Sequence, residues 1–190
     1  MKKLSTLLLT GALLIISMLT TSTPAIAKLK KAEGGFRAKA YADADGHSIG
    51  FGHFIRANEA HLLTQTVTLD WANKQMRADI APLELQINQA VPKGFNQNQF
   101  DALIDFGYNC GSGALSKVLV TWNSTHSTDA VTKHINQYVK SKDQTGQLKV
   151  NPVLVARRDA EALLFSSTYI PKVIPFLAIA AVGLAYIAFS

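Results

Sequence analysis

Two carboxylic acids, Glu33 and Asp43, stand ten residues apart in the chain. Such a pair can cleave a glycosidic bond, because one acid protonates the leaving oxygen while the other carboxylate activates water, attacks carbon or stabilises the cationic transition state. Glu33 ends an apolar-flanked helical turn, where burial raises a pKa, whereas Asp43 lies in a glycine-rich turn that keeps it ionised. Two acids at this spacing are more often surface charges, so the pair alone does not decide the function.

The residues around this pair belong to a longer pattern. Within 33–53 the chain contains Glu-Gly-Gly-Phe-Arg, then Ala-Tyr-Ala-Asp, then Ser-Ile-Gly-Phe-Gly-His. This pattern resembles the signature of the phage-type lysozymes, glycoside hydrolase family 24, which has Glu-Gly-x-Arg, Ala-Tyr-x-Asp, and a hydroxyl residue before Ile-Gly-x-Gly-His. The segments 98–115 and 152–165 resemble the second and third blocks of the same family, in the same order. The resemblance therefore spans residues 28–165.

The resemblance implies a bacteriolytic glycosidase, a muramidase that hydrolyses the bond between N-acetylmuramic acid and N-acetylglucosamine in peptidoglycan without a cofactor. It assigns Glu33 as the catalytic acid and Asp43 as the second carboxylate. Ser48 matches the hydroxyl that helps to hold the attacking water, where most relatives have threonine. It also implies inversion at the anomeric carbon, which requires about 6.5 to 9.5 Å between the two carboxyl groups.

Two departures from the family pattern fall beside these residues. One glycine is inserted between Glu33 and Arg37, and the turn after Asp43 is one residue shorter than the commonest form. Asp45 is therefore an alternative second carboxylate and, with Tyr41, a candidate residue of the substrate cleft. Because glycine absorbs an inserted residue at little steric cost, we keep Glu33 and Asp43 as the pair.

Two other functions stay open at this point. A lytic transglycosylase attacks the same bond but leaves an anhydro sugar and needs one essential carboxylate, and the retention of Asp43 and Ser48 argues against it. A catalytically inactive, membrane-anchored peptidoglycan-binding protein of a virion or envelope would tolerate the inserted glycine. Analysis of the sugar ends released from peptidoglycan separates all three functions.

Four further residues of the pattern are expected to be structural. His53 is expected to be a buried, ion-paired histidine, with Asp79 on the following helix as its partner, rather than a metal ligand. No second histidine stands at metal-ligand spacing, so no metal site is predicted. Asn109 and Gly111 are expected at a helix end and a turn of the larger lobe.

Two consecutive arginines lie on the last helix of the matched region. We expect one of Arg157 and Arg158 to face the cleft near Glu33 and the other to face a core carboxylate, so both are candidate cleft residues. The alternative is a set of surface ion pairs that contribute little to stability. The single cysteine, Cys110, cannot close an intramolecular disulfide and is expected to be a buried small residue.

The pattern of glycine and apolar residues predicts a lysozyme-like α+β fold. Glycine and aspartate are dense in 35–53, which indicates short strands and tight turns in a small mixed β lobe. From Thr68 apolar residues recur every three or four positions, which predicts a long capped helix that Pro82 kinks or divides. That helix joins the small lobe to a larger helical lobe, with the ligand cleft between the two. Further helices are expected from Asn96, where Gln99 completes a capping arrangement, to Gly111 and Gly113, and over 127–139 and 153–165.

The composition fits a single folded unit with an anionic partner. A chain of 190 residues suits one domain or two small lobes that share a core. The formal net charge of +6 favours anionic partners such as cell-wall polymers or anionic lipid, but the scattered basic residues do not indicate nucleic acid. We therefore expect a monomer that binds peptidoglycan glycan strands.

The first 27 residues have the layout of a secretory signal peptide. Lys2 and Lys3 precede an apolar run over 7–19, and a small-x-small cleavage site ends at Ala27. The alternative is an uncleaved N-terminal membrane anchor. Either form implies that the protein is exported.

The last part of the chain is the most apolar. Residues 173–189 hold no charged or amide side chain and are just long enough for a transmembrane helix, which needs about 17 to 20 residues. The alternative is a C-terminal helix packed on the domain. The sequence thus predicts apolar helices at both chain ends and a membrane-anchored, periplasm-facing or virion-membrane protein. The predicted domains are a signal peptide or anchor over 1–27, a catalytic domain over 28–168, and a transmembrane helix over 169–190.

Overall fold

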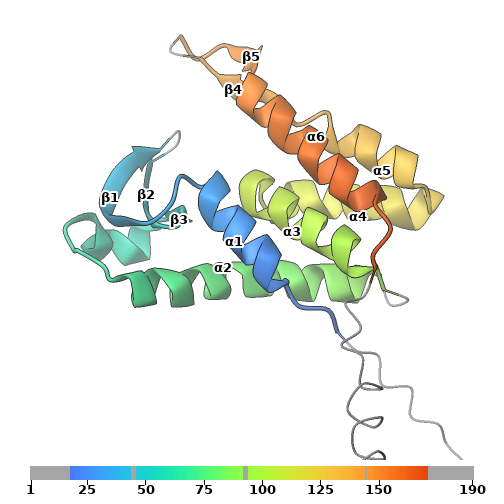
Figure 1. Cartoon of the computed structure of the whole chain (residues 1–190). Helices are drawn as coiled ribbons and strands as arrows, with labels where there is room; N and C mark the ends of the chain where they lie inside the picture. Colours follow the sequence, from blue (N-terminus) through green and yellow to red (C-terminus); the bar gives the residue numbers. More distant parts are fainter. Residues whose placement is uncertain (1–17, 44–45, 92–93, 144, 171–190) are drawn as a thin grey trace, which may run out of the picture.

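A small antiparallel sheet lies beside the first part of one long helix, and a larger group of helices lies beside its second part (Figure 1). The computed structural model describes residues 18–43, 46–91, 94–143 and 145–170. The mixed α+β fold that the sequence predicts is confirmed. In chain order the elements are α1 (Thr23–Ala32), β1 (Arg37–Asp43), β2 (Gly46–Gly50), β3 (His53–Phe54), the 3-10 helix η1 (Ala57–Leu63), α2 (Leu69–Ala90), α3 (Gln97–Cys110), α4 (Ser112–Thr125), α5 (Thr128–Ile135), β4 (Lys140–Lys142), β5 (Leu148–Val150) and α6 (Pro152–Ser166).

The small lobe is built on the sheet β1-β2-β3, whose neighbouring strands are antiparallel. The register of β1 on β2 shifts between Arg37 and Tyr41, as at a β-bulge, and such a shift re-aims the side chains that follow it. Ile49 of β2 is fully buried and packs with the apolar side chains Ile55, Leu62 and Val67. This small core supports the sheet that carries Asp43, Ser48 and His53.

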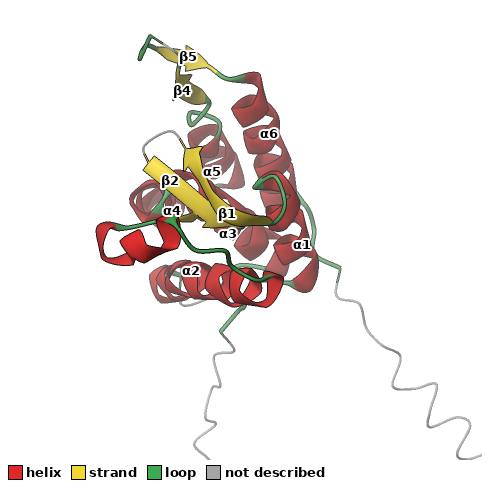
Figure 2. Ribbon diagram, turned by 90° about the vertical axis from the view of Figure 1, so that its left-hand side faces the viewer, coloured by secondary structure: helices red, strands yellow, loops and turns green. Residues whose placement is uncertain are grey.

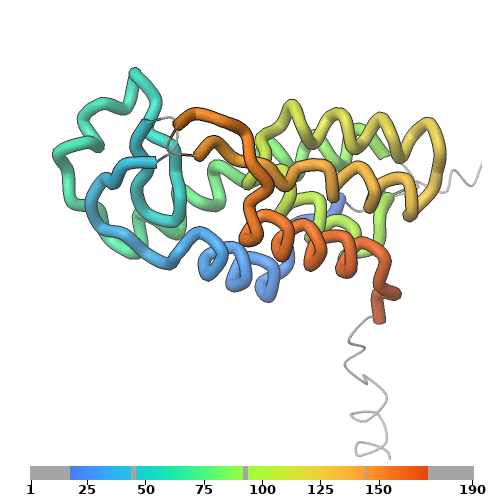
Figure 3. Tube along the Cα trace, turned by 90° about the horizontal axis from the view of Figure 1, so that it is seen from above, coloured from blue at the N-terminus to red at the C-terminus, as the bar shows by residue number. Residues whose placement is uncertain are grey.

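Helix α2 connects the two lobes. Thr68 caps it by accepting a hydrogen bond of 3.1 Å from the backbone N of Trp71. The helix runs without a break through Pro82, so the division expected there is wrong. A proline removes one backbone hydrogen bond, but Ile80 and Leu83 on either side are buried in the main core and hold the helix together. Figure 3 shows the small lobe at one end of the molecule and the helices at the other.

Helix α3 forms the centre of the larger lobe and is surrounded by α2, α4 and α6. The predicted capping box is present, since Asn96 accepts from the backbone N of Gln99 at 3.0 Å and the Gln99 side chain accepts from the backbone N of Asn96 at 3.1 Å. Gly111 ends α3 with a φ of 83°, a conformation that favours glycine. Gly113 does not end α3, because it lies inside α4.

Two elements of the larger lobe were not expected from the sequence. Helix α4 was missed, although Leu115, Val118 and Leu119 have helical spacing and are buried. The β4–β5 hairpin was missed because its exposed Leu148 and Val150 do not form a buried alternating pattern, and α5 consequently stops at Ile135 instead of Val139. In Figure 2 this hairpin stands apart from the three-stranded sheet.

Helix α1 lies across the boundary that the sequence predicted at residue 28. Helix α1 spans the expected cleavage site after Ala27, and its Ile26 and Leu29 side chains are buried in the main core. Ser22 caps the helix, and its backbone N and Oγ both donate to Asp101, at 3.0 and 2.6 Å. The described residues 18–27 therefore pack as part of the folded unit. Small residues at this spacing occur both at signal-peptide cleavage sites and in the first turns of an amphipathic helix.

The membrane predictions rest mainly on segments outside the described residues. Residues 1–17 and 171–190, which hold most of the two apolar runs, are among those not described. None of the helices formed by residues 18–43, 46–91, 94–143 and 145–170 combines the length and apolar content needed to cross a membrane.

A buried ion pair fastens the small sheet to α2. His53, at the start of β3, has a side chain that is only 3% exposed, and its Nδ1 lies 2.9 Å from Asp79 Oδ2. This is the partner that the sequence suggested. Glu59 Oε2 of η1 lies 3.3 Å from His53 Nε2, and Gln75 donates to Asp79 Oδ1 at 3.0 Å. Burial alone would lower the pKa of His53, but Asp79 and Glu59 outweigh it and raise that pKa.

The pair predicts a pH-dependent contribution to stability. Because the folded pKa of His53 is raised, the stabilisation is complete below its ordinary value of 6.5 and is lost as pH rises through the folded value. Asp79→Asn should lower the free energy of unfolding by about 2 kcal/mol at about pH 5 and by clearly less at about pH 9. Urea denaturation at both values measures this.

Asp70→Asn is the matched control, since Asp70 is an exposed acid on the same helix, paired with Lys74. It should change the stability by less than about 0.5 kcal/mol at either pH. Equal losses for Asp79→Asn at the two values would contradict the prediction.

Candidate active site

Glu33 stands at the C-terminal end of α1, where the chain turns toward the sheet. It is the C-cap residue, and the next two residues close a Schellman motif: Gly34 N donates to Lys31 O at 3.1 Å and Gly35 N donates to Lys30 O at 2.9 Å. Gly34 and Gly35 have φ values of 80° and 81°, which other residues adopt only with strain. The extra glycine is thus accommodated in the turn that follows Glu33.

The Glu33 carboxyl group is mostly buried and meets one cation. Arg157 Nη2 of α6 donates to Glu33 Oε1 at 2.9 Å, and only 18% of the Glu33 side chain is exposed. Burial raises the pKa of Glu33; Arg157 opposes this, while the charges of Asp105 and Asp43 add to the rise. The net shift is upward, so Glu33 keeps its proton to a higher pH than an exposed glutamate.

Glycine is also required opposite Glu33. Gly52 has a φ of 84°, and a Cβ atom added to it would lie 2.8 Å from Glu33 Oε2. Tyr108 of α3 donates a hydrogen bond of 3.0 Å to the backbone O of Phe51, which fixes the same turn from the larger lobe. The Gly-x-Gly part of the sequence pattern therefore gives the backbone room beside the acid.

Asp43 and Ser48 come from paired strands of the small sheet. Ser48 Oγ donates to Asp43 Oδ2 at 2.8 Å, and Ser48 is 1% exposed. Tyr41 lies opposite Ser48 in the register of β1 and β2, and the Arg37 guanidinium covers its ring at 4.2 Å. The Asp43 carboxylate is therefore oriented by a buried hydroxyl, while its charge reaches Glu33 across the site.

Arg157 is shared by three carboxylates. Besides Glu33, it binds Asp105 of α3, with Nε donating to Oδ1 at 3.0 Å and Nη2 lying 2.8 Å from the same oxygen. Glu161 Oε1 lies 3.5 Å from Arg157 Nε, and Lys28 Nζ of α1 lies 3.2 Å from Asp105 Oδ2. Helices α1, α3 and α6 are thus joined by one network of charges.

Of the two arginines that the sequence offered for the cleft and for a core carboxylate, Arg158 is the one that lies in the core. Its side chain is fully buried, and its Nη2 donates to Glu161 Oε1 at 2.7 Å and to Asn109 Oδ1 at 3.0 Å. Cys110, free and half-buried, accepts from Arg158 Nη1. Burial raises the pKa of Glu161, and the Arg158 charge opposes this. Arg158 therefore faces the core carboxylate, and Arg157 faces Glu33.

Most of the candidate site residues lie close together in the structure. Glu33, Asp43, Ser48 and Tyr41 lie around one site with Arg157, whereas Asp45 is not among the described residues. The contributions of Asp105 and Glu161 were missed. An acid among apolar residues, as Asp105 stands between Ile104 and Phe106, is the signal of a buried pair that could have indicated it.

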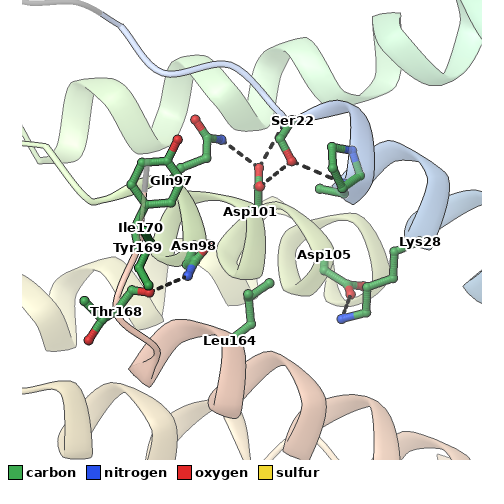
Figure 4. A pocket seen from close by; sticks show the side chains of 12 residues that line it. Ser22, Lys28, Gln97, Asn98, Asp101, Asp105, Leu164, Thr168, Tyr169 and Ile170 are labelled. Carbon is green, nitrogen blue, oxygen red and sulfur yellow. Dashed lines mark hydrogen bonds and ion pairs between the residues drawn. The ribbon is translucent and has the colours of Figure 1, made fainter. Parts of the chain in front are cut away.

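A separate pocket opens beside the charge network. It has a volume of about 750 Å³ and lies between α1, α3 and the residues after α6 (Figure 4). Lys28 and Asp105 line one side, and Asp101 lines the wall, where Ser22 and Gln97 donate to its carboxylate. Neither Glu33 nor Asp43 lines this pocket, so it differs from the cleft expected between the lobes.

Comparisons with known proteins identify similar chains. Residues 31–161 match the model of the family described as phage lysozyme. The endolysin of Bacillus phage B103 is 32% identical over 141 residues, which cover 72% of this chain and 51% of that endolysin, so the chain spans about half its length. The endolysin of Salmonella phage P22 is 30% identical over 154 residues, covering 79% of this chain and 100% of that protein.

A solved structure shares the same fold. The muramidase domain of SpmX from Asticaccaulis excentricus superimposes with a TM-score of 0.66 at 30% identity, covering 78% of this chain and 99% of that one. The arrangement of a small sheet, a long connecting helix and a helical lobe is therefore common to both proteins.

The geometry predicts how Glu33 titrates. Arg157→Gln should raise the pKa of Glu33 further, because the substitution removes the cation that favours its carboxylate. Carbon-detected NMR of the glutamate carboxyl groups measures the titration directly. Arg77→Gln, at an exposed position of α2, is the control and should leave the Glu33 titration unchanged. A lower pKa in Arg157→Gln would show that the contact with Arg157 is not the main favourable charge at this site.

Proposed function

The chain belongs to the phage lysozyme family, and on that premise we propose that it is a muramidase that hydrolyses the β-1,4 bond between N-acetylmuramic acid and N-acetylglucosamine in peptidoglycan. The resemblance drawn from the sequence is thereby confirmed at the level of the family. One observation carries the finer proposal. Glu33 is buried with a raised pKa, and the charge of Asp43, whose carboxylate is oriented by a hydrogen bond from Ser48, contributes to that rise.

Glu33 is the general acid in this proposal. Its burial raises its pKa and so favours the protonated carboxyl group, and that proton passes to the glycosidic oxygen as the bond from this oxygen to the anomeric carbon breaks. Arg157 holds the carboxyl group in place through Oε1. A strained or mobile acid would be less effective, because proton transfer requires a fixed distance to the leaving oxygen.

Asp43 and Ser48 act on the water in this proposal. The hydroxyl of Ser48 donates to one oxygen of Asp43 and so fixes the plane of the carboxylate. The carboxylate then orients a water molecule on the opposite face of the sugar and accepts its proton as the oxygen bonds to the anomeric carbon. This order of events inverts the configuration at that carbon.

The cellular role belongs to the same proposal. Both phage proteins compared above carry the name endolysin, and a bacteriolytic role would require that the chain reach the cell wall. The net charge of +6 would favour contact with anionic wall polymers. We therefore propose wall degradation as the biological activity.

Sugar-end analysis of digested peptidoglycan tests the function. The full chain is incubated with purified sacculi, and the released fragments are identified by mass spectrometry. Reducing ends support the muramidase, anhydro ends identify a lytic transglycosylase, and the absence of release identifies a binding protein. The last two outcomes overturn the proposal.

The acid role predicts the effect of removing one proton donor. Glu33→Gln should keep the fold and lower the rate of fragment release by more than about a hundredfold, because an amide cannot donate the proton. Glu84→Gln is the matched control, since Glu84 accepts from Thr21 at the other end of α1 and does not contact Arg157. A rate in Glu33→Gln within about tenfold of the unmodified chain would rule out the assignment.

The second carboxylate is tested by comparing two neighbouring acids. Asp43→Asn should lower the rate by at least about a hundredfold, because the water would lose the base that orients and deprotonates it. Asp45→Asn should leave the rate nearly unchanged. The opposite ranking in assays on the same sacculi would transfer the role to Asp45.

A further inference from the structure

Asp105 occupies a position that the catalytic proposal does not use. It lies on α3, its side chain is only 4% exposed, and it faces both a lysine and an arginine. Arg157 Nε and Nη2 both meet Asp105 Oδ1, while Lys28 Nζ meets Oδ2. Asp105 is thus held between two cationic side chains from two different helices.

The contact with Arg157 bears directly on Glu33. Arg157 Nη2 lies 2.8 Å from Asp105 Oδ1 and 2.9 Å from Glu33 Oε1, so one nitrogen serves both acids. Arg157 Nε also donates to Asp105, and this second contact fixes the plane of the guanidinium. Nη2 is the nitrogen that donates to Glu33. Glu33 therefore receives a hydrogen bond from an arginine that also binds Asp105.

A general acid requires this balance. An arginine that paired with Glu33 alone would favour the carboxylate strongly, because charge-assisted contacts stabilise the ionised form. An ionised Glu33 has no proton to transfer to the leaving oxygen. The arginine must therefore hold Glu33 in place without strongly favouring its ionised form.

We propose that Asp105 is a positioning residue that takes up the charge of Arg157, so that Arg157 orients Glu33 while Glu33 remains protonated. This inference rests on the role of Glu33 as the acid in the proposed muramidase. Asp105 does not itself touch the reacting atoms, because it acts on Glu33 through Arg157.

The other groups around Glu33 do not perform this task. Asp43 and Tyr41 face Glu33 from β1, and Tyr108 faces it from α3. Glu161 reaches Arg157 Nε only at 3.5 Å and forms its shorter contact, 2.7 Å, with Arg158. The charge of Asp105 also raises the pKa of Glu33 directly, in addition to the effect of burial.

Lys28 allows a test of the direction in which the Glu33 pKa shifts. Its side chain is 45% exposed at the edge of the pocket in Figure 4, and it partly neutralises Asp105 through Oδ2. Without Lys28, the Asp105 carboxylate would interact more strongly with Arg157, and Arg157 would favour the ionised form of Glu33 less. Substitutions at Asp105 and Lys28 should therefore shift the titration of Glu33 in opposite directions.

The experiment measures the pH profile of kcat/KM on peptidoglycan for the full chain carrying Asp105→Asn. The neutral side chain frees Arg157 to favour the Glu33 carboxylate, so the loss of activity on the alkaline side should begin at lower pH. We expect kcat/KM to fall by up to about tenfold on the alkaline side of the profile, and to change little on its acid side. NMR titration of the Glu33 carboxyl group should show a lower pKa, whereas Lys28→Gln should raise it.

Asp101→Asn is the matched control. Asp101 lies one turn earlier on α3, is also buried, and accepts hydrogen bonds from Ser22 and Gln97 instead of Arg157. This variant should lose stability but keep the pH profile of the unmodified chain. An equal loss of activity at all pH values in Asp105→Asn, with an unchanged Glu33 titration, would overturn the proposal.

The NMR titration separates this proposal from the proposed function. If the chain releases no sugar fragments, the muramidase assignment fails, but the coupling from Asp105 through Arg157 to Glu33 is still measured. If Asp105→Asn does not fold, the titration of Glu33 in Lys28→Gln decides the question, and an unchanged or lowered pKa there overturns the proposal.

Discussion

The charge of one guanidinium, on Arg157, holds together three helices that are far apart in the chain. It meets Glu33 at the end of α1, Asp105 in α3 and Glu161 in α6, all with side chains that are mostly buried. Removing one partner from such a group leaves another charge buried without compensation, which is costly. Lys28 and Arg158 complete the set, so that three cations face three acids. The Glu33 carboxyl group can therefore be buried because it meets Arg157, which is itself held by Asp105 and Glu161.

The small lobe contributes the other half of the site and depends on a second ion pair. Asp43 and Ser48 are held in the β1–β2 register, and this sheet is fastened to α2 where His53 meets Asp79. Because α2 also packs into the main core, the position of Asp43 relative to Glu33 is set through this one long helix. A change in the packing of α2 would therefore be transmitted to the spacing of the two carboxylates.

Two features of the surroundings of Glu33 act on its pKa in opposite directions. Burial raises the pKa of Glu33 and so favours its protonated form in the folded protein, whereas Arg157 favours the ionised form. The glycines beside it have a related role. Gly34 and Gly35 adopt left-handed conformations that turn the chain after Glu33, and Gly52 leaves room for its carboxyl group. The extra glycine relative to the family pattern lies in this turn and leaves Glu33 at the helix end.

The sequence by itself determined the local features. The cap residues Thr68 and Asn96, the α+β composition and the family pattern around Glu33 depend on neighbours within a few positions, and the structure contains each of them where expected. Tertiary structure decided the rest. Adjacent residues on a helix point about 100° apart, so only packing selects Arg157 for Glu33 and Arg158 for the core. The same holds for Asp105, whose partners come from α1 and α6, and for residues 18–27, which contact α2 and α3. These choices depend on contacts between distant segments, which no local pattern of residues records.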